Sequence, residues 1–138
     1  MNNETLAVYL KKAGYSMTNS RREVFNLLAD KAPLTMHAIW KQLEGSTDRS
    51  SIYRTVSLFE RLGIIQRINR GWKYTLELTD AFVPHHHHFT CTNCSKVINF
   101  EEPTKLDSVL NELASHNDFE IKSHTLEVAG LCKDCRTS

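Results

Sequence analysis

Apolar positions in the first half of the chain recur at the spacing of an amphipathic helix. This periodicity predicts helices over residues 6–13, 20–30, 35–43 and 49–62. Ser20 and Glu23 fit the S-x-x-E capping box at the start of the second helix. Thr35 is a candidate cap for the third helix, and Gly63 lies just past the end of the fourth.

Beyond Gly63 the pattern changes to alternation. Residues 64–68 and 72–78 are predicted to form two strands joined by a turn at 69–71. Helices followed by a hairpin predict a winged helix–turn–helix, in which the last helix enters the DNA major groove. The candidate DNA contacts, chosen for their guanidinium or hydroxyl groups, are Arg49, Ser51, Tyr53 and Arg54 on that helix and Arg70 in the turn. One alternative is a small helical domain whose surface happens to be basic, and another is a winged helix that serves as a protein-interaction module.

The second half of the chain mixes strand and helix patterns. Residues 96–100 are predicted to form a strand, 104–116 a helix and 119–128 a strand. The apolar parity of the last strand shifts along its length, which suggests a bulge near residues 123–124. A strand of this length with few partners in its own domain favours pairing across a dimer.

Composition and charge divide the chain in the same place. Its 138 residues, 41% hydrophobic and 24% charged, are typical of one globular domain or two small ones. Residues 1–72 hold eleven Lys or Arg and six Asp or Glu, a formal charge of +5; residues 73–138 hold six and ten, a charge of −4. With no run long enough to span a bilayer and no secretory signal at the start, we expect a cytoplasmic protein that does not bind membranes.

Four cysteines form two C-x-x-C pairs, Cys91 with Cys94 and Cys132 with Cys135. In a cytoplasmic protein, this spacing predicts one Zn²⁺ held by four thiolates, with a small domain folded in the 37 residues between the pairs. A redox dithiol is the alternative, but it needs a thioredoxin-like βαβ context that the pattern does not contain.

Four consecutive histidines, residues 85–88, precede the first pair of cysteines. In a strand, alternate residues face opposite sides, so His86 and His88 would serve one site and His85 and His87 another. Imidazole suits several transition metals, so the ligand type does not choose the ion. A solvated polar loop is the alternative, and the sequence near the histidines contains no nucleophile motif of an enzyme.

Three segments together resemble the ferric uptake regulator (Fur) family. They are residues 84–100, which contain the histidine run and the first cysteine pair; residues 51–56, which resemble the family's recognition helix; and residues 17–22. The closing pair at 132–135 also fits. The resemblance implies an α+β fold: a winged helix–turn–helix over 1–78, a hinge at 79–84, and over 85–138 a small α/β dimerisation domain with a four-cysteine zinc site.

The resemblance also implies the ligands of three metal sites and one further DNA contact. Matched positions are Cys91, Cys94, Cys132 and Cys135 for structural zinc; Glu77, His86 and His88 for a regulatory ion at the hinge; His85, His87, Asp107 and His124 for a second site; and Arg21 for DNA. Two positions differ from the family's hinge ligands, since Pro33 stands where the family has a histidine and Asn99 where it often has an acid. His37, Glu101 and Glu102 are candidate replacements.

The function that follows is a dimeric, metal-responsive repressor, not an enzyme. It would bind an inverted-repeat operator in double-stranded DNA and control genes of metal homeostasis or oxidative stress. A structural Zn²⁺ and a second divalent ion, Fe²⁺, Zn²⁺ or Mn²⁺, are the expected cofactors. A metal-buffering or metallochaperone-like protein that does not bind an operator is the alternative.

Overall fold

The computed structural model describes residues 3–30, 33–70 and 73–137. The chain divides into two compact units, Met1–Pro84 and His85–Ser138. No helix within the described ranges is long and apolar enough to cross a membrane. The predicted turn at 69–71 lies partly outside the described residues, and so does the side chain of Arg70.

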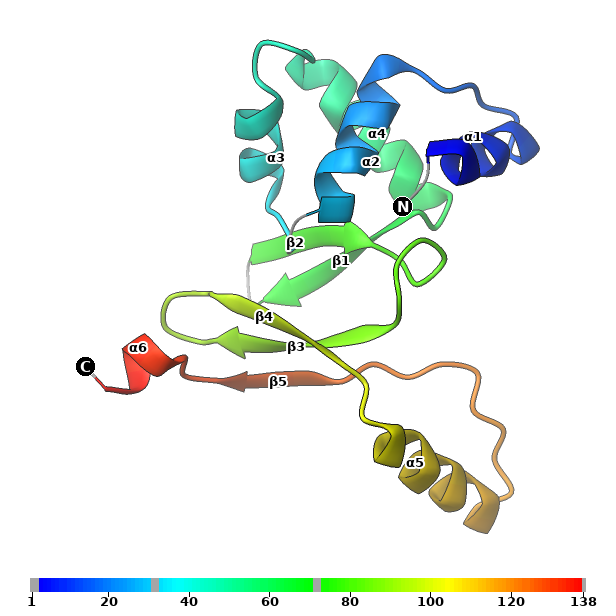
Figure 1. Cartoon of the computed structure of the whole chain (residues 1–138), viewed down its shortest axis with the longest axis vertical. Helices are drawn as coiled ribbons and strands as arrows, with labels where there is room; N and C mark the ends of the chain where they lie inside the picture. Colours follow the sequence, from blue (N-terminus) through cyan, green and yellow to red (C-terminus); the bar gives the residue numbers. More distant parts are fainter. Residues whose placement is uncertain (1–2, 31–32, 71–72, 138) are drawn as a thin grey trace. The chain divides into compact units, whose positions relative to one another are not determined.

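The first unit consists of four helices and a hairpin (Figure 1). Its elements are α1 (Asn3–Lys12), α2 (Asn19–Asp30), α3 (Met36–Leu43), α4 (Arg49–Arg61), β1 (Ile65–Arg70) and β2 (Lys73–Leu78). The hairpin is antiparallel, with Ile65 opposite Leu78. Leu34 adds a bridge to Leu76 through two backbone hydrogen bonds, of 3.0 and 2.7 Å, and so ties the segment before α3 to the hairpin.

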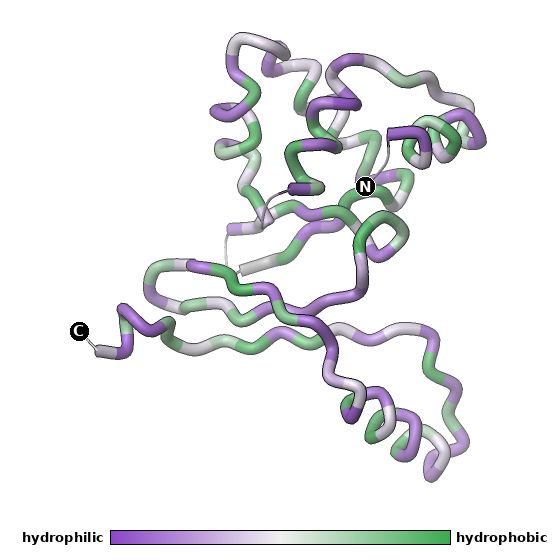
Figure 2. Tube along the Cα trace, viewed as in Figure 1, coloured by the Kyte–Doolittle hydropathy of each residue, from purple (hydrophilic) through white to green (hydrophobic). Residues whose placement is uncertain are grey.

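An apolar core holds this unit together (Figure 2). Every helix and both strands contribute to it, including Leu6 of α1, Phe25 of α2, Ile39 of α3, Phe59 of α4 and Leu76 of β2, all fully buried. Burying side chains of this size contributes roughly 1.5–3 kcal/mol each before entropy is considered. The amphipathic periodicity of the sequence therefore corresponds to real packing.

Capping explains where the helices begin, and it corrects one prediction. Thr35 caps α3, since its Oγ1 accepts the Ala38 amide at 3.0 Å. The capping box at residues 20–23 is wrong: α2 begins at Asn19, and Thr18 accepts the Arg21 amide at 3.2 Å. The Glu23 carboxylate accepts hydrogen bonds from Ser46 and Thr47 instead, so a tertiary contact replaces the local one.

The last turn of α4 ends in a Schellman motif. Gly63 has a φ of +75°, and its amide donates to the Glu60 carbonyl at 3.1 Å. The Ile64 amide donates to the Phe59 carbonyl at 2.8 Å. A left-handed residue here favours glycine, which lets the chain reverse from α4 into the hairpin.

The second unit is built on a three-stranded sheet of order β4–β3–β5. Its elements are β3 (His86–Cys91), β4 (Val97–Glu101), α5 (Thr104–His116), β5 (Glu127–Gly130) and the short α6 (Lys133–Arg136), which the sequence patterns missed. β3 pairs with β4 antiparallel and with β5 parallel. The parallel pairing needs a crossover, and α5 lies in that connection.

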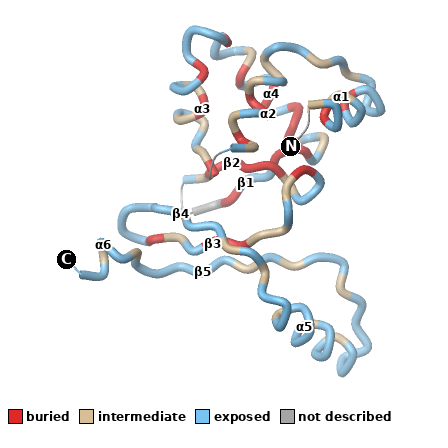
Figure 3. Tube along the Cα trace, viewed as in Figure 1, coloured by how far each residue is buried: buried red, intermediate tan, exposed pale blue. Residues whose placement is uncertain are grey.

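Burial in this unit is sparse (Figure 3). Among its described residues, those classed as buried are His87, His88 and Cys91. No residue of α5 is buried, and its Val109 and Leu113 are 51% and 54% exposed. The apolar side chains of this helix therefore pack against no buried core among the described residues of one chain.

The predicted strand over 119–128 is mostly wrong for the single chain. Strand structure begins at Glu127, and residues 119–126 carry none. The reason is the shortage of partners: among the residues that the structure describes, β3 pairs with 127–130 and with no earlier part of the segment. An extended segment without a neighbouring strand has unmade backbone hydrogen bonds.

Candidate functional site

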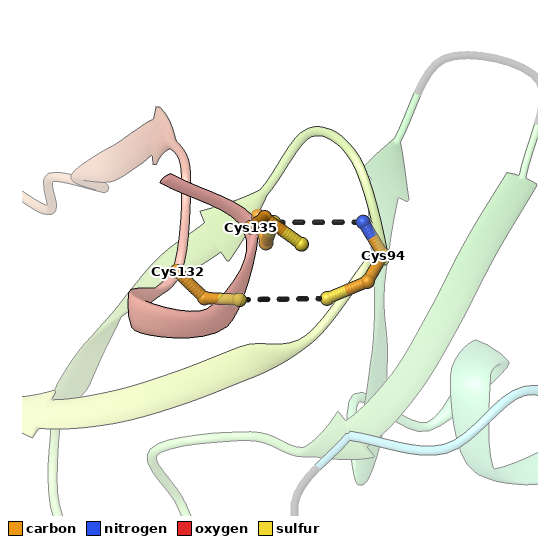
Figure 4. A group of neighbouring side chains, drawn as sticks. Cys94, Cys132 and Cys135 are labelled. Atoms are coloured by element: carbon orange, nitrogen blue, oxygen red, sulfur yellow. Dashed lines mark hydrogen bonds between the residues drawn. The ribbon is translucent and has the colours of Figure 1, made fainter. Parts of the chain in front are cut away.

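The four cysteines meet at one end of the second unit's sheet. Cys91 is the last residue of β3 and Cys94 lies in the turn that follows, while the segment around α6 supplies Cys132 and Cys135. All four Sγ atoms lie within 4.8 Å of one another. Cys94 and Cys132 face each other with their Sγ atoms 3.7 Å apart (Figure 4). A tetrahedral ion with Zn–S bonds of about 2.3 Å requires a separation of about 3.8 Å. The donor set therefore fits Zn²⁺.

Backbone amides around the cysteines favour thiolates. The amide of Cys94 donates to Cys91 Sγ at 3.5 Å. This hydrogen bond, followed by one from Cys132, lowers the pKa of Cys91 to about 6. The amide of Cys135 likewise lowers the pKa of Cys132. Because the thiolate is the form that binds a metal, the loops favour metal binding before the ion arrives.

Cys135 behaves differently from the other thiols. The Asn93 side chain donates to its Sγ at 3.2 Å, which lowers its pKa, but the neighbouring Cys132 and burial outweigh that bond. The net effect raises the pKa of Cys135 to about 11. Thiols this close cannot all ionise without a cation between them, so a bound divalent ion would remove the conflict.

A second cluster lies in the same unit and contains His85, His87, Glu102 and His124, whose ligand atoms lie within 4.8 Å of one another. The Nε2 atoms of His85 and His124 are 3.4 Å apart. Tetrahedral coordination with metal–nitrogen bonds of 2.0–2.1 Å requires about 3.3 Å between two nitrogens. The structure thus brings together three histidines and one carboxylate in a set that suits a transition metal.

The carboxylate in this cluster is Glu102, in place of the predicted Asp107. Glu102 lies at the end of β4, 2.9 Å from His87 Nε2, and also contacts His124. The hydrogen bond to His87 is the main reason why the pKa of Glu102 is lowered, and one to Asp107 adds to it. Asp107, in the first turn of α5, therefore contacts the cluster through Glu102. The sequence offered Glu102 as a candidate ligand at the hinge site, whereas the structure places it with His85, His87 and His124.

The opposite face of β3 presents His86 and His88, with ring centroids 4.9 Å apart. Glu101 stands opposite His86 across the β3–β4 ladder, and Asn99 stands opposite His88. On the other side, Glu127 of β5 pairs in register with His88, and its Oε1 lies 2.9 Å from His88 Nδ1. A carboxylate on one ring nitrogen fixes the tautomer and leaves the other nitrogen as the metal-binding one.

The remaining hinge candidates belong to the first unit. Glu77, on β2, is 5% exposed, and the Gln66 side chain donates to its Oε1 at 2.9 Å. His37 lies on α3, where its ring centroid is 5.7 Å from that of Trp40. Carboxylate and imidazole are both ligand types that divalent transition metals accept.

Four of the predicted DNA contacts line a groove of about 730 Å³ in the first unit, bounded by α4, the start of α2 and the segment before it: Arg21, Ser51, Tyr53 and Arg54. Arg49 does not line this groove. Its lining includes Arg21, Arg54 and Arg61, and no carboxylate stands among the lining residues that the structure describes. Arg61 donates to the Tyr15 hydroxyl at 3.1 Å, and the Arg21 guanidinium lies 5.6 Å from the Tyr15 ring centroid. Guanidinium groups gathered along one groove suit a phosphate backbone.

Comparison with known proteins decides the family. The sequence matches the Ferric uptake regulator family over residues 12–129. The chain belongs to this family. It is 30% identical over 132 residues to the peroxide-responsive repressor PerR of Staphylococcus epidermidis, covering 92% of this chain and 85% of the relative. It is also 30% identical over 135 residues to the ferric uptake regulation protein of Escherichia coli K12, covering 92% of this chain and 89% of the relative.

Solved structures of ferric uptake regulators share the fold. The Helicobacter pylori regulator Fur, described as having three functional metal binding sites, superposes with a TM-score of 0.80 at 27% identity, over 98% of this chain and 91% of that one. A zinc-bound manganese uptake regulator superposes with a TM-score of 0.69 at 26% identity, over 93% of this chain and 98% of that one. The predicted α+β fold with a winged helix–turn–helix is confirmed, and the chain is a metal-responsive transcriptional regulator. Its family is one of regulators rather than enzymes.

Three residues of this Fur-family protein's sites were missed by sequence reasoning. Glu127 contacts a candidate ligand, Arg61 lines the basic groove, and Tyr15 binds two of the groove's arginines. Glu127 is separated from His88 by 39 residues, and only the parallel register of β3 and β5 reveals the contact. Arg61 lies seven residues after Arg54, two helical turns on, so the face of α4 could have been extended to it.

Proposed function

We propose that this regulator is a dimeric repressor that binds an inverted-repeat operator in double-stranded DNA. The observation that carries the proposal is the groove lined by Arg21, Arg54 and Arg61 beside α4. Tyr53 and Arg54 lie exposed on the same helix, which can enter the major groove while the arginines contact phosphates. Arg49, Ser51 and Arg70 complete the proposed contacts, and the regulator works in the cytoplasm.

The dimer is proposed from the apolar surface of the second unit. Phe89, Ile98 and Val128 lie on one face of the sheet, and each is 37% exposed or more. Val109 and Leu113 of α5 and Phe119 beyond it are more exposed still. A partner chain would cover these side chains and give the unpaired residues 119–126 a strand to join.

The regulatory ion is proposed to bind Glu77, His86 and His88. The ion would take ligands from both units and so join them. Glu101, opposite His86, is a candidate for the missing acid, and His37 for the missing histidine. Ligands from both units would favour one arrangement of the two winged helices in the dimer, and metal would then shift the population toward the form that binds DNA.

Two further ions are proposed for the second unit. Cys91, Cys94, Cys132 and Cys135 would hold a structural Zn²⁺ that keeps the last residues of the unit next to β3. His85, His87, Glu102 and His124 would hold a second divalent ion, with Asp107 supporting Glu102. Imidazole and carboxylate donors suit Fe²⁺, Mn²⁺ and Zn²⁺, so both exchangeable sites are proposed to take an ion of this class.

The DNA-binding proposal is tested by selection from a duplex library with a randomised core. Protein refilled with Zn²⁺, Fe²⁺ or Mn²⁺ is compared with chelated protein, and bound duplexes are sequenced. We expect one of these ions to support enrichment of an inverted repeat. An Arg54→Ala variant is expected to lose most of this binding. If no ion gives an enriched sequence, a metal-buffering role replaces the repressor.

The hinge is tested with a His86→Ala/His88→Ala variant on the selected duplex. We expect it to lose metal-dependent DNA affinity while keeping its zinc and its dimeric state. A matched control is His116→Ala, at the exposed end of α5. Full metal-dependent affinity in the double variant would disprove the hinge proposal. The dimer is tested separately with Leu113→Asp, which is expected to sediment as a monomer that retains zinc.

A further inference from the structure

Arg49, the first residue of α4, is held by two aromatic rings. Its guanidinium carbon lies 4.9 Å from the ring centroid of Trp40 and 5.7 Å from that of Tyr53. Trp40 comes from α3, whereas Tyr53 lies one turn further along α4. Rings on two different elements therefore fix the position of one cation, each through a cation–π contact.

The guanidinium keeps its hydrogen-bond donors available. No carboxylate pairs with Arg49 among the residues that the structure describes, and none of the described hydrogen bonds engages its guanidinium. The neighbouring Asp48 uses its carboxylate to cap α4, accepting from the Ser51 amide at 3.1 Å and from Ser51 Oγ at 2.6 Å. A ring contact occupies the flat face of a guanidinium, while its N–H groups lie in the plane of the group.

Binding a phosphate does not require a guanidinium that is fixed in one orientation. Phosphate contacts tolerate a mobile charge, and Arg21, Arg54 and Arg61 already supply three cations beside α4. A bidentate contact to guanine O6 and N7 requires a planar fork in one orientation, and the first residues of a recognition helix are the ones that meet base edges. The rings lower the side-chain entropy that Arg49 would otherwise lose on binding.

We propose that Arg49 reads a guanine in each half of the operator and that Trp40 is a positioning residue, which holds Arg49 in its reading orientation together with Tyr53. This rests on the proposed function, because it requires DNA binding through α4. The inference extends the interface to α3, a helix from which the sequence reasoning drew no DNA contact.

The test uses the duplex enriched by the wild-type protein and a set of duplexes in which each G·C pair is changed to A·T in both half-sites. We expect one symmetric position at which this change weakens wild-type binding by about 5- to 150-fold, the range for one bidentate contact. Arg49→Lys keeps the charge but not the fork, and Trp40→Ala removes the larger ring. Both are expected to lose the preference at that position alone and to keep it at the others.

Controls separate positioning from folding and from charge. Trp40→Phe keeps a ring and is expected to retain part of the preference, and circular dichroism verifies that all variants fold. Lys11→Ala removes one exposed cation from α1 and is expected to leave the preference intact. In a Trp72→Phe background, Trp40 is the sole tryptophan, so its fluorescence reports the contact between Arg49 and the Trp40 ring without DNA. Arg49→Ala is expected to change this fluorescence.

Three results would overturn the inference. One is a uniform loss of affinity across all duplexes with a shallower salt dependence in Arg49→Ala, which indicates a phosphate contact. Another is a guanine preference that survives both Arg49→Lys and Trp40→Ala. The third is Trp40 fluorescence that does not respond to Arg49→Ala. Each leaves the repressor proposal standing, whereas a failure to enrich any duplex removes both.

Discussion

In the first unit, apolar side chains from four helices and a hairpin pack into one core; in the second, the described residues that are buried are His87, His88 and Cys91, each a candidate metal ligand. Apolar residues of the second unit, such as Phe119 at 68% exposure, lie on its surface. The first unit can be stabilised by hydrophobic burial within the chain. Because the second unit buries so few apolar side chains, we expect it to be stabilised by metal and by a partner chain.

The largest expected effect is removal of zinc from the four-cysteine site. Structural zinc contributes on the order of 10 kcal/mol to the folding of small metal-dependent domains, so the second unit is expected to unfold when Cys94 is changed to Ser or a strong chelator is added. Amide NMR spectra follow the two units separately, and elemental analysis follows the zinc. The first unit is the internal control and is expected to keep its dispersed resonances. A Cys94→Ser chain that stays folded and dimeric would show that the zinc is dispensable.

A core truncation in the first unit is expected to give the opposite result. Phe25→Ala removes a fully buried ring that packs edge-on against Phe82 with centroids 5.4 Å apart, at a cost of about 3–5 kcal/mol. Both tryptophans lie in the first unit, so urea unfolding followed by their fluorescence measures this loss. Zinc content is expected to be unchanged. Phe119→Ala is the matched control, with an effect below about 0.5 kcal/mol on the fluorescence transition.

A polar contact in the second unit is expected to affect metal affinity rather than folding. Glu127→Ala removes the carboxylate that orients His88, and losing such a partner typically weakens metal binding about 10- to 100-fold. Titration with Co²⁺, read from its visible absorption, measures the change. Glu120→Ala, at an exposed position of the same unit, is the control. Equal affinities in the two variants would show that His88 does not depend on Glu127.

The smallest effect is expected at a helix cap of the first unit. Thr35→Ala removes the side-chain acceptor for the Ala38 amide and should lower the free energy of unfolding by about 1 kcal/mol. Thr35→Ser keeps the acceptor and should restore most of the loss. A Thr35→Ser variant no more stable than Thr35→Ala in the same urea experiment would show that the cap contributes little.

The sequence predicted the first unit well because its patterns are local. Helical periodicity placed α2, α3 and α4 to within a residue or two, and Thr35 was identified as a cap from its position alone. The predicted capping box at Ser20 was wrong because the Glu23 carboxylate accepts hydrogen bonds from Ser46 and Thr47, which lie 23 and 24 residues further along the chain. Local chemistry predicts an element reliably when no distant group competes for the same side chain.

In the second unit, prediction depended on contacts between distant segments. Alternation predicted that His85 and His87 face one side of the strand and His86 and His88 the other, and in the structure the two pairs lie in different side-chain clusters. Alternation did not predict that Glu102 joins the first cluster or that Glu127 contacts His88 through a parallel register. The long final strand was wrong because strand structure requires a neighbouring strand, which the single chain does not provide for residues 119–126.

By itself the sequence determined the ligand types, the spacing of the two cysteine pairs, the basic character of the first half and the order of the main elements, since these follow from residue identity and short-range periodicity. Tertiary structure alone decided that Glu102 joins the cluster of His85, His87 and His124, that Glu127 contacts His88, which arginines line the groove and which rings contact Arg49. The physical reason is that a ligand set, or a guanidinium between two rings, is defined by distances of a few ångströms between side chains from different elements. Those distances are set by strand register and helix packing, which residue spacing along the chain does not specify.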